Sequence, residues 1–198
     1  MDIDAHIMEY FRVKKGDVPP YTGWLKSSRA DMAKVMAVAG YKEGAEIGVC
    51  KGGHALQLFK IIPGLHLYCI DPWTKYSVRN SQKMQDENYK TTCVRLKDRN
   101  ASILTKTSTQ ALADIEDGAL DFIYIDGLHT FDAVMGDLIN WAPKVKIGGM
   151  IAGHDYYAFY RSGVIEAVNA YVRAHGVDAW YLTRELQATF FWVKKHDD

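Results

Sequence analysis

The sequence predicts an α/β fold with a doubly wound, mostly parallel sheet that ends in a C-terminal antiparallel β-hairpin. Short apolar runs typical of buried strands alternate with helical patterns along most of the chain, as expected for a parallel sheet with helices on both faces. A glycine-rich turn, residues 45–54, follows the first of these strands. Two β-rich runs near the end are joined by a polar link, residues 184–188, that is too short for a helix, so the last strand must be antiparallel.

The N-terminal residues, 1–40, are expected to form a helical cap or arm in front of the core. Residues 1–26 scatter aromatic side chains around a Pro-Pro pair, which indicates a short helix followed by an irregular arm. This arm either covers the core or forms part of a substrate lid. Two adjacent serines are good N-caps for a second helix over residues 27–39, and Gly40 ends it.

The core, residues 42–198, is expected to complete a single domain. Its strands are short runs of apolar and β-branched residues, whereas its helices carry apolar residues at helical spacing and end at glycine or proline. The helix over residues 84–97 also has acidic residues early and basic residues late, which suits the helix dipole. Strands are predicted at residues 44–49, 66–70, 102–105, 119–125, 150–152, 180–183 and 189–194, and helices at residues 54–61, 84–97, 110–115, 131–141 and 163–174.

The composition argues against several classes of protein. Of the 198 residues, 48% are hydrophobic, which suffices for the core of one domain. The 24 basic and 24 acidic residues cancel, so there is no electrostatic case for nucleic acid or an anionic membrane as a partner. No apolar run reaches the roughly 18 residues of a membrane helix. The three cysteines, Cys50, Cys69 and Cys93, form no metal-binding pattern and are expected to be reduced thiols of a cytoplasmic protein.

The turn at residues 45–54 (AEIGVCKGGH) is the first candidate for a ligand site. Its glycines allow backbone conformations and close contacts that side chains would forbid. The helix that follows would present its free N–H groups to a ligand. Asp71 ends the second strand, where a carboxylate accepts hydrogen bonds from a ribose diol. The turn and Asp71 together indicate an adenosine-type cofactor.

Three motifs stand out: EIGVCKGG at residues 46–53, IDPW at 70–73, and DFIYIDGLH at 121–129 together with GGMIAGHD at 148–155. They resemble those of class I S-adenosylmethionine-dependent methyltransferases, and the last combination closely resembles the family labelled methyltransferase 24. That family is similar to macrolide-sugar and catechol-type O-methyltransferases. The resemblance covers about residues 42–157. It implies a Rossmann-like, seven-stranded sheet and S-adenosylmethionine as the methyl donor.

The resemblance also implies which residues contact the cofactor. Glu46 and Gly48 would shape the site of its methionine end, and Asp71 would bind the ribose hydroxyls. The residues after the third strand, Thr107 and Ser108, would lie near the adenine.

One residue of the glycine turn departs from the family pattern. Cys50 stands where the commoner pattern has glycine. It narrows the turn but leaves Gly52 and Gly53 for close approach, so the cofactor site is expected to be altered rather than lost. The missing glycine, together with the terminal hairpin, argues against a nicotinamide-dependent dehydrogenase. Trp73 either packs on the adenosine or covers the sheet edge.

Acidic and imidazole side chains follow two strands that should be neighbours. Asp126 ends the fourth predicted strand, and His154 and Asp155 end the fifth, so their side chains are expected to converge. The resembling metal-dependent enzymes carry carboxylate or amide ligands at these three places, which implies a divalent cation, Mg²⁺ or Mn²⁺, on the acceptor oxygen. With one imidazole, the set suits Mn²⁺ or Fe²⁺ better than Mg²⁺. Alternatively, the three residues hydrogen-bond the acceptor and the cofactor.

His129 is the candidate for a general base. It lies three residues after Asp126, at the offset where the catechol-type enzymes carry their catalytic base. An imidazole titrates near neutrality and can take a proton from a hydroxyl group. The alternative is a helix-cap or surface histidine.

The predicted function is O-methylation of a small hydroxylated molecule, such as a sugar or a natural-product glycoside. Tyr156, Tyr157 and Tyr160, which follow the fifth strand, either line the acceptor pocket or serve packing. A catalytically silent cofactor-binding module is the main alternative, and a nicotinamide-dependent oxidoreductase is less favoured. Neither nucleic acid nor a membrane is expected as a partner. The aromatic N-terminal arm offers a surface on which a second subunit of a homo-oligomer could pack.

Overall fold

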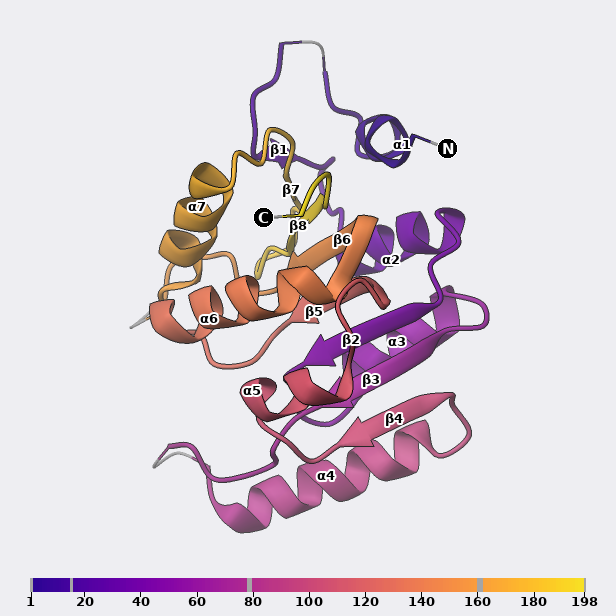
Figure 1. The fold of residues 1–198 in the computed structure, drawn as a ribbon, viewed down its shortest axis with the longest axis vertical. Coiled ribbons are helices and arrows are strands. Elements are labelled where there is room, and N and C mark those ends of the chain that lie inside the picture. Colours follow the sequence, from indigo (N-terminus) through magenta and orange to yellow (C-terminus); the bar gives the residue numbers. More distant parts are fainter. Residues whose placement is uncertain (1, 15, 78–79, 160–161, 198) are drawn as a thin grey trace.

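Helices cover both faces of a central sheet in the computed structural model (Figure 1), which describes residues 2–14, 16–77, 80–159 and 162–197. Strands and helices alternate through the core, as predicted. The helices are α1 (Ile3–Tyr10), α2 (Arg29–Val38), α3 (Gly53–Ile61), α4 (Gln82–Leu96), α5 (Ser108–Ala111), α6 (Phe131–Trp141) and α7 (Val164–Ala174). The strands are β1 (Tyr21–Thr22), β2 (Glu43–Ile47), β3 (His66–Ile70), β4 (Ala101–Leu104), β5 (Leu120–Ile125), β6 (Val145–Gly153), β7 (Tyr181–Leu182) and β8 (Phe190–Val193).

The sheet has the order β1-β7-β8-β6-β5-β2-β3-β4. β8 runs antiparallel to both of its neighbours, and the other pairs are parallel. The predicted α/β class with a terminal antiparallel hairpin is therefore confirmed. The chain proceeds outward from β2 to β4 and then returns to β5 on the other side of β2. This reversal creates a switch point between β2 and β5, where open α/β sheets bind their ligands beyond the carboxyl ends of the strands.

The described part of the sheet has eight strands rather than the expected seven. The additional strand, β1, lies in the segment predicted to be an irregular arm, and it pairs in parallel with β7. The N–H of Tyr21 donates to the carbonyl of Trp180 at 2.8 Å, and that of Gly23 to the carbonyl of Leu182 at 2.9 Å. A strand of two residues has no periodicity to read, so only its distant partner reveals it. β6 also begins earlier than predicted, at Val145 rather than residue 150.

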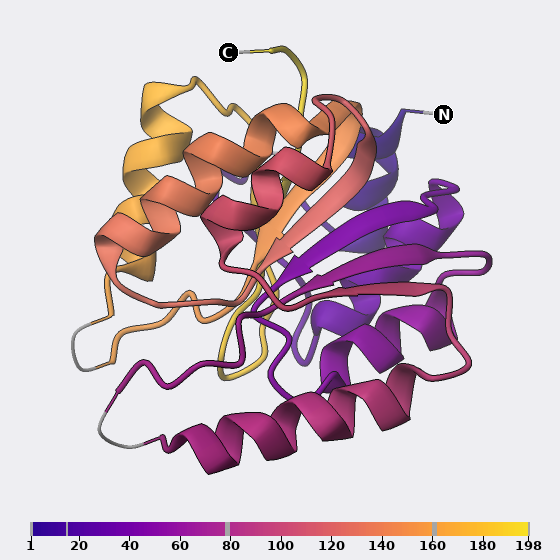
Figure 2. The same cartoon turned by 60° about the horizontal axis from the view of Figure 1, so that its bottom comes forward.

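Helices lie on both faces of the sheet (Figure 2), and an apolar cluster on each face holds them in place. On one face α1 to α4 pack through side chains such as Met32 and Leu58, and on the other α5 to α7 pack through side chains such as Leu138 and Val168. Each of these four side chains is fully buried, which stabilises the fold by about 1.5–3 kcal/mol per large apolar residue. Among the described helices, none is both long enough and apolar enough to cross a membrane.

Asp121 links β2, β5 and β6 near their amino-terminal ends, which lie opposite the switch point. Its Oδ2 accepts hydrogen bonds from the N–H groups of Lys42 (2.7 Å) and Glu43 (2.8 Å), and Lys146 Nζ lies 2.6 Å from its Oδ1. Burial alone would raise the pKa of Asp121, but Lys146 and the two backbone donors lower it below its usual value. The ionised carboxylate therefore stabilises the native state.

We expect Asp121→Asn to lower the free energy of unfolding by about 2 kcal/mol at pH 7, because hydrogen bonds to a charged group are lost. A lowered native pKa gives stability above the unfolded pKa, near 3.9, that is lost as the pH falls through the native value. Urea unfolding should therefore show a gap between the two proteins at neutral pH that closes in acid. Asp117→Asn removes an exposed partner of Lys144 and should change stability little. An equal gap for Asp121→Asn at both pH values would contradict this assignment.

Candidate active site

Three neighbouring strands, β2, β5 and β6, end side by side at the switch point, and the residues that follow them form the candidate site. Backbone hydrogen bonds extend the sheet past the last strand residues. The N–H of Asp126 donates to the carbonyl of Ile47 at 2.8 Å, and that of His154 donates to the carbonyl of Ile125 at 3.0 Å. The polar residues after these strands are therefore placed relative to one another by the sheet.

Gly48 lies where the backbones of β2 and β5 come closest. Its φ is +91°, and a Cβ built on it would lie 2.1 Å from the carbonyl oxygen of Asp126. No side chain fits there, so glycine is required by both conformation and space. Gly52, with a φ of +68°, begins α3 as its N-cap.

Asp71, the predicted ribose ligand, holds the glycine turn. Its Oδ2 accepts hydrogen bonds from the N–H groups of Val49 (3.1 Å) and Cys50 (2.9 Å), and its Oδ1 accepts one from the N–H of Trp73 (2.8 Å). A carboxylate offers about four acceptor sites. The backbone therefore uses most of the capacity of Asp71, and Oδ1 keeps one acceptor site.

Cys50 is part of the glycine turn, and Trp73 stabilises the turn through a hydrogen bond to its carbonyl group. Cys50 is exposed, with a φ of +53°, and its carbonyl accepts hydrogen bonds from Trp73 Nε1 (2.8 Å) and Thr92 Oγ1 (3.1 Å). Trp73 is only 4% exposed and packs on Tyr89 with ring centroids 5.0 Å apart. These contacts bury Trp73 against other residues of the protein, which favours a covering role over packing on the adenosine.

Glu46 and His54 form a buried pair beneath the turn. Nδ1 of His54 lies 3.1 Å from Oε1 of Glu46, and both side chains are at most 5% exposed. The His54 ring packs on Tyr124, with centroids 4.0 Å apart. Burial raises the pKa of Glu46, and His54 opposes the shift. Oε2 of Glu46 and Nε2 of His54 are buried and have no hydrogen-bond partner among the described residues.

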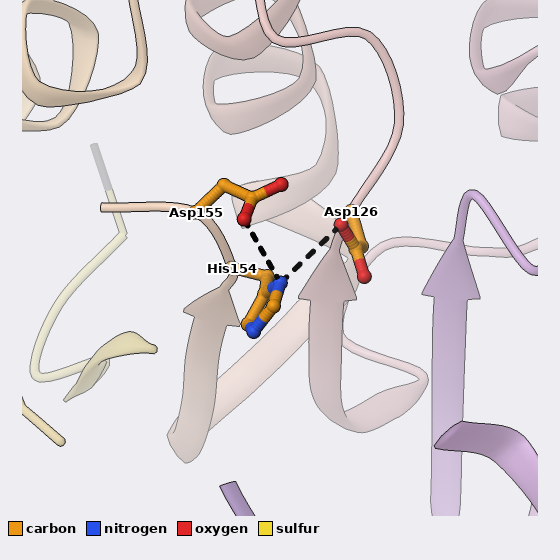
Figure 3. Close-up of side chains that lie close together, drawn as sticks. All are labelled: Asp126, His154 and Asp155. Atoms are coloured by element: carbon orange, nitrogen blue, oxygen red, sulfur yellow. Dashed lines mark ion pairs between the residues drawn. The ribbon is translucent and has the colours of Figure 1, made fainter. Parts of the chain in front are cut away.

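The structure brings Asp126, His154 and Asp155 together at the tips of β5 and β6 (Figure 3). Nδ1 of His154 lies 3.8 Å from Oδ1 of Asp126 and 3.4 Å from Oδ1 of Asp155. One ligand atom from each of the three residues lies within 4.8 Å of the others. Burial lowers the pKa of His154 despite the two carboxylates, so its imidazole is neutral at pH 7 and able to donate a lone pair.

His129 joins this cluster from the loop before α6. Its Nε2 lies 2.9 Å from Oδ2 of Asp155 and 3.6 Å from Oδ1 of Asp126. Interactions with Asp126 and Asp155 raise the pKa of His129 to about 9, against the effect of burial. His129 is therefore an imidazolium at neutral pH, whereas the sequence suggested an imidazole that titrates near neutrality. The reason is that two carboxylates from different strands share one imidazole.

Ser108, predicted to lie near adenine, has its hydroxyl group engaged by protein. It donates to a carboxylate oxygen of Asp137 and accepts a hydrogen bond from Trp141 Nε1 at 2.8 Å. Burial raises the pKa of Asp137 to about 6 despite this hydrogen bond. Thr107 caps α5 through its side chain. Ser108 and Thr107 thus fix the start of α5, and the hydrogen-bond network extends to Asp137 on α6.

Aromatic residues form one side of the site beyond β6. Tyr157 stacks on Phe159 at 4.7 Å, and Phe159 meets the His129 ring edge to face at 5.6 Å. Tyr156 instead packs on Trp180 at 5.6 Å. Tyr160 lies outside the described residues. Phe159, which no sequence motif indicated, therefore lies beside His129, and Tyr157 packs on it.

Two further charged residues reach this edge of the sheet from segments that the sequence analysis did not assign to the site. Arg29 is the first residue of α2, and its N–H donates to Oε1 of Glu185 at 2.8 Å. Its guanidinium interacts with the Tyr124 hydroxyl and with the charges of Asp126 and Glu185. Both residues lie outside the stretch that carries the family motifs, and only the fold brings the cap and the hairpin to this edge.

The fold is that of a Rossmann-like α/β protein, and its candidate site is a cluster of charged residues at the switch point. Residues 45–156, more than half of the chain, match the family described as a methyltransferase domain. The chain belongs to this family, methyltransferase 24. The match begins within β2 and ends just after β6, so it contains most of the candidate site.

Solved structures of similar fold include two O-methyltransferases. One is TomG from Streptomyces achromogenes, which is involved in tomaymycin synthesis and was determined in complex with SAM. Its TM-score is 0.60 at 10% identity, and the comparison covers 98% of this chain and 90% of that chain. The O-methyltransferase from Bacillus cereus in complex with SAH has a TM-score of 0.60 at 11% identity, with 96% and 89% covered. At such identities, the likeness shows the fold.

A curated relative shares sequence over a shorter stretch. The uncharacterized protein y4gI of Sinorhizobium fredii is 34% identical over 90 residues. These residues are 46% of this chain but only 8% of that protein. The relative is therefore much longer, and its similarity concerns one part of it.

Proposed function

We propose that this protein is an S-adenosylmethionine-dependent O-methyltransferase that acts on a hydroxyl group of a small molecule. The observation that carries the proposal is that His129 Nε2 contacts both Asp155 (2.9 Å) and Asp126 (3.6 Å), where the backbone of Asp126 meets Gly48 of the glycine turn. Methyl transfer to a hydroxyl group requires a positioned acceptor and a group that takes its proton. The family membership and the SAM- and SAH-bound neighbours of similar fold support the choice of cofactor.

The residues present fit the cofactor. Asp71 keeps one free acceptor site on Oδ1. Oε2 of Glu46 is a buried acceptor without a partner among the described residues, and such groups call for a donor. When bound, S-adenosylmethionine supplies a methyl group activated by its sulfonium. The protein must then orient the acceptor and remove its proton.

The cluster after β5 and β6 would perform these two tasks. His129, in its neutral form, would direct Nε2–H to Asp155 and accept the proton of the acceptor hydroxyl at its other ring nitrogen, Nδ1. Asp126 and Asp155 would then stabilise the imidazolium through the contacts they already make with Nε2. Tyr157 and Phe159 would exclude water on one side.

The cluster also fits a divalent cation. Two carboxylates and a neutral imidazole, with ligand atoms within 4.8 Å of one another, suit Mn²⁺ or Fe²⁺ better than Mg²⁺. Asp126, His154 and Asp155 would hold the ion. When bound, it would lower the pKa of the acceptor hydroxyl and fix its direction. The acceptor that we favour is a sugar or natural-product hydroxyl, which is too weakly acidic to react unaided.

Calorimetry with S-adenosylhomocysteine and, separately, with NAD tests the cofactor. Turnover with a panel of sugars, glycosides and catechols, in EDTA or in Mn²⁺, tests the reaction. Binding of S-adenosylhomocysteine without turnover of any acceptor would indicate a silent cofactor-binding module. Binding of NAD alone would refute the methyltransferase proposal, and equal turnover in EDTA would refute the part assigned to the metal.

Cys50→Gly tests whether the departure in the glycine turn matters. The contacts of Cys50 that hold the turn are made by its N–H and carbonyl groups, and glycine keeps both. Glycine also accommodates a φ of +53° without the steric cost that other residues bear. We expect the Kd for S-adenosylhomocysteine to change by less than about threefold. A larger change would show that the thiol side chain itself borders the cofactor.

A further inference from the structure

A glutamate, a histidine and a serine stand in a row on three neighbouring strands, toward the amino-terminal ends of the strands and away from the candidate active site. Nδ1 of His66 on β3 lies 2.7 Å from Oε2 of Glu43 on β2, and its Nε2 lies 2.9 Å from Oγ of Ser102 on β4. The register explains the row, because Glu43 pairs with His66 and Ser102 pairs with Tyr68, two residues further along β3. Side chains two residues apart in a strand share a face, so all three side chains lie on one face of the sheet.

The chemistry of the three groups fixes the direction of both hydrogen bonds. A carboxylate can only accept, so Nδ1 of His66 carries the hydrogen that Glu43 receives. In the neutral imidazole Nε2 is then an acceptor, and the hydroxyl group of Ser102 donates to it. A hydroxyl group that donates to an imidazole, which is itself oriented by a carboxylate, is the arrangement that activates a serine as a nucleophile.

The backbone beside Ser102 offers a donor for an oxyanion. β4 is the last strand at its side of the sheet (Figure 1). The carbonyl of Asn100 accepts a hydrogen bond from the N–H of Leu67 at 3.1 Å, so the even-numbered residues of this strand direct their backbone groups to β3. The N–H of Ile103 therefore points away from the sheet. The residue after a nucleophile is a usual source of an N–H group for the oxyanion.

Solvent reaches the three side chains. The side chain of His66 is 21% exposed and that of Glu43 is 45% exposed, and Ser102 is half-buried. The ring of Tyr68 meets His66 edge to face, with centroids 4.7 Å apart. Tyr68 therefore supplies an apolar border beside the hydroxyl group of Ser102, its register partner.

We propose that Ser102, His66 and Glu43 form a second catalytic site, which hydrolyses small activated esters and does not depend on methyl transfer. Oγ of Ser102 attacks the ester carbonyl carbon, and Nε2 of His66 takes the hydroxyl proton. As the bond between the carbonyl carbon and the alcohol oxygen breaks, His66 passes this proton to the departing alkoxide. Glu43 stabilises the imidazolium formed between these two events. Water then attacks the acyl-serine by the same route, which releases a carboxylic acid and restores the Ser102 hydroxyl group.

A fluorophosphonate probe, which reacts with activated serines, and the ester para-nitrophenyl acetate test this site on the full chain. Peptide mass mapping should find the phosphonate on Ser102, and Ser102→Ala should abolish both this adduct and ester hydrolysis. Because a general base is lost, His66→Gln should slow both reactions at least about tenfold. Glu43→Gln should slow both, since the charge that stabilises the imidazolium is removed. Ser102→Thr keeps the hydroxyl group and suits a strand, so it should retain part of both reactions.

Ser81→Ala provides the matched control, because Ser81 is an exposed serine whose hydroxyl group caps α4. It should leave the labelling of Ser102 and the ester hydrolysis unchanged. No adduct on Ser102 in folded wild-type protein, as judged by circular dichroism, would overturn the proposal. An adduct that forms equally fast in His66→Gln would also overturn it, because the serine would then be merely accessible. Labelling of Ser102 without hydrolysis of the ester would overturn the hydrolytic activity.

Discussion

Replacing His129 with alanine should lower kcat by 10²–10⁴-fold, the usual contribution of a general base, and leave the Kd for S-adenosylhomocysteine within about twofold. The reason is geometric, because Nε2 of His129 lies 2.9 Å from Asp155 and 3.6 Å from Asp126 at the tips of the strands. Steady-state kinetics at saturating cofactor, combined with calorimetry, would measure both quantities.

The pH dependence sharpens this test. With a pKa of about 9, His129 is protonated at neutral pH and cannot accept a proton until the pH approaches that value. The kcat of wild-type protein without metal should therefore rise with pH up to about 9, and His129→Ala should lack this rise. A divalent cation on Asp126 and Asp155 would oppose the proton, so added Mn²⁺ should move the rise to lower pH.

His66→Gln provides the matched control for methyl transfer, because His66 also pairs with a carboxylate, that of Glu43, but lies at the opposite end of the strands. It should leave kcat unchanged. Near-normal turnover of His129→Ala with bound cofactor would exclude His129 as the base and return it to the role of a loop or helix-cap residue.

Gly48→Ala should have the largest effect on folding. A Cβ at this position would lie 2.1 Å from the carbonyl oxygen of Asp126 and 2.7 Å from the N–H nitrogen of Gly127, and the backbone φ is +91°. Conformational strain and overpacking each cost roughly 1–3 kcal/mol. We expect the free energy of unfolding to fall by about 3–5 kcal/mol, with loss of cofactor binding because Asp126 must move.

Gly40→Ala separates these two contributions. Gly40 has a φ of +77°, but no atom lies within 4 Å of a Cβ built there. Its replacement should cost only the conformational strain, about 1–2 kcal/mol. Urea unfolding of both variants would measure the difference, and similar losses for both would mean that β2 and β5 can separate at little cost.

Sequence patterns predicted the core of the fold because the physics there is local or periodic. Apolar runs located β2, β3 and β5, and the carboxyl ends of parallel strands must meet at one edge. Asp126, His154 and Asp155 were therefore predicted to converge, and the structure places them together. The terminal hairpin followed from chain length alone, since residues 184–188 cannot form a crossover.

The features that sequence patterns did not reveal depend on partners far away in the chain. β1 exists only because β7 pairs with it. The proton affinity of His129 depends on two carboxylates from different strands, and Arg29 reaches the site only because the hairpin holds α2. The backbone contacts of Asp71 likewise could not be inferred from its place at a strand end. Such properties emerge from tertiary structure rather than from any local pattern.

The contact between the cap and the hairpin has a consequence for the order of folding. The N–H of Arg184 donates to the Ser27 carbonyl at 3.0 Å. Oε1 of Glu185 accepts a hydrogen bond from the N–H of Arg29, and these two residues are 156 positions apart in the chain. Contacts of such high contact order form late. During synthesis, the cap emerges from the ribosome early and must wait for the hairpin. We therefore expect the parallel core to assemble first, and the edge that carries Arg29 to become ordered last.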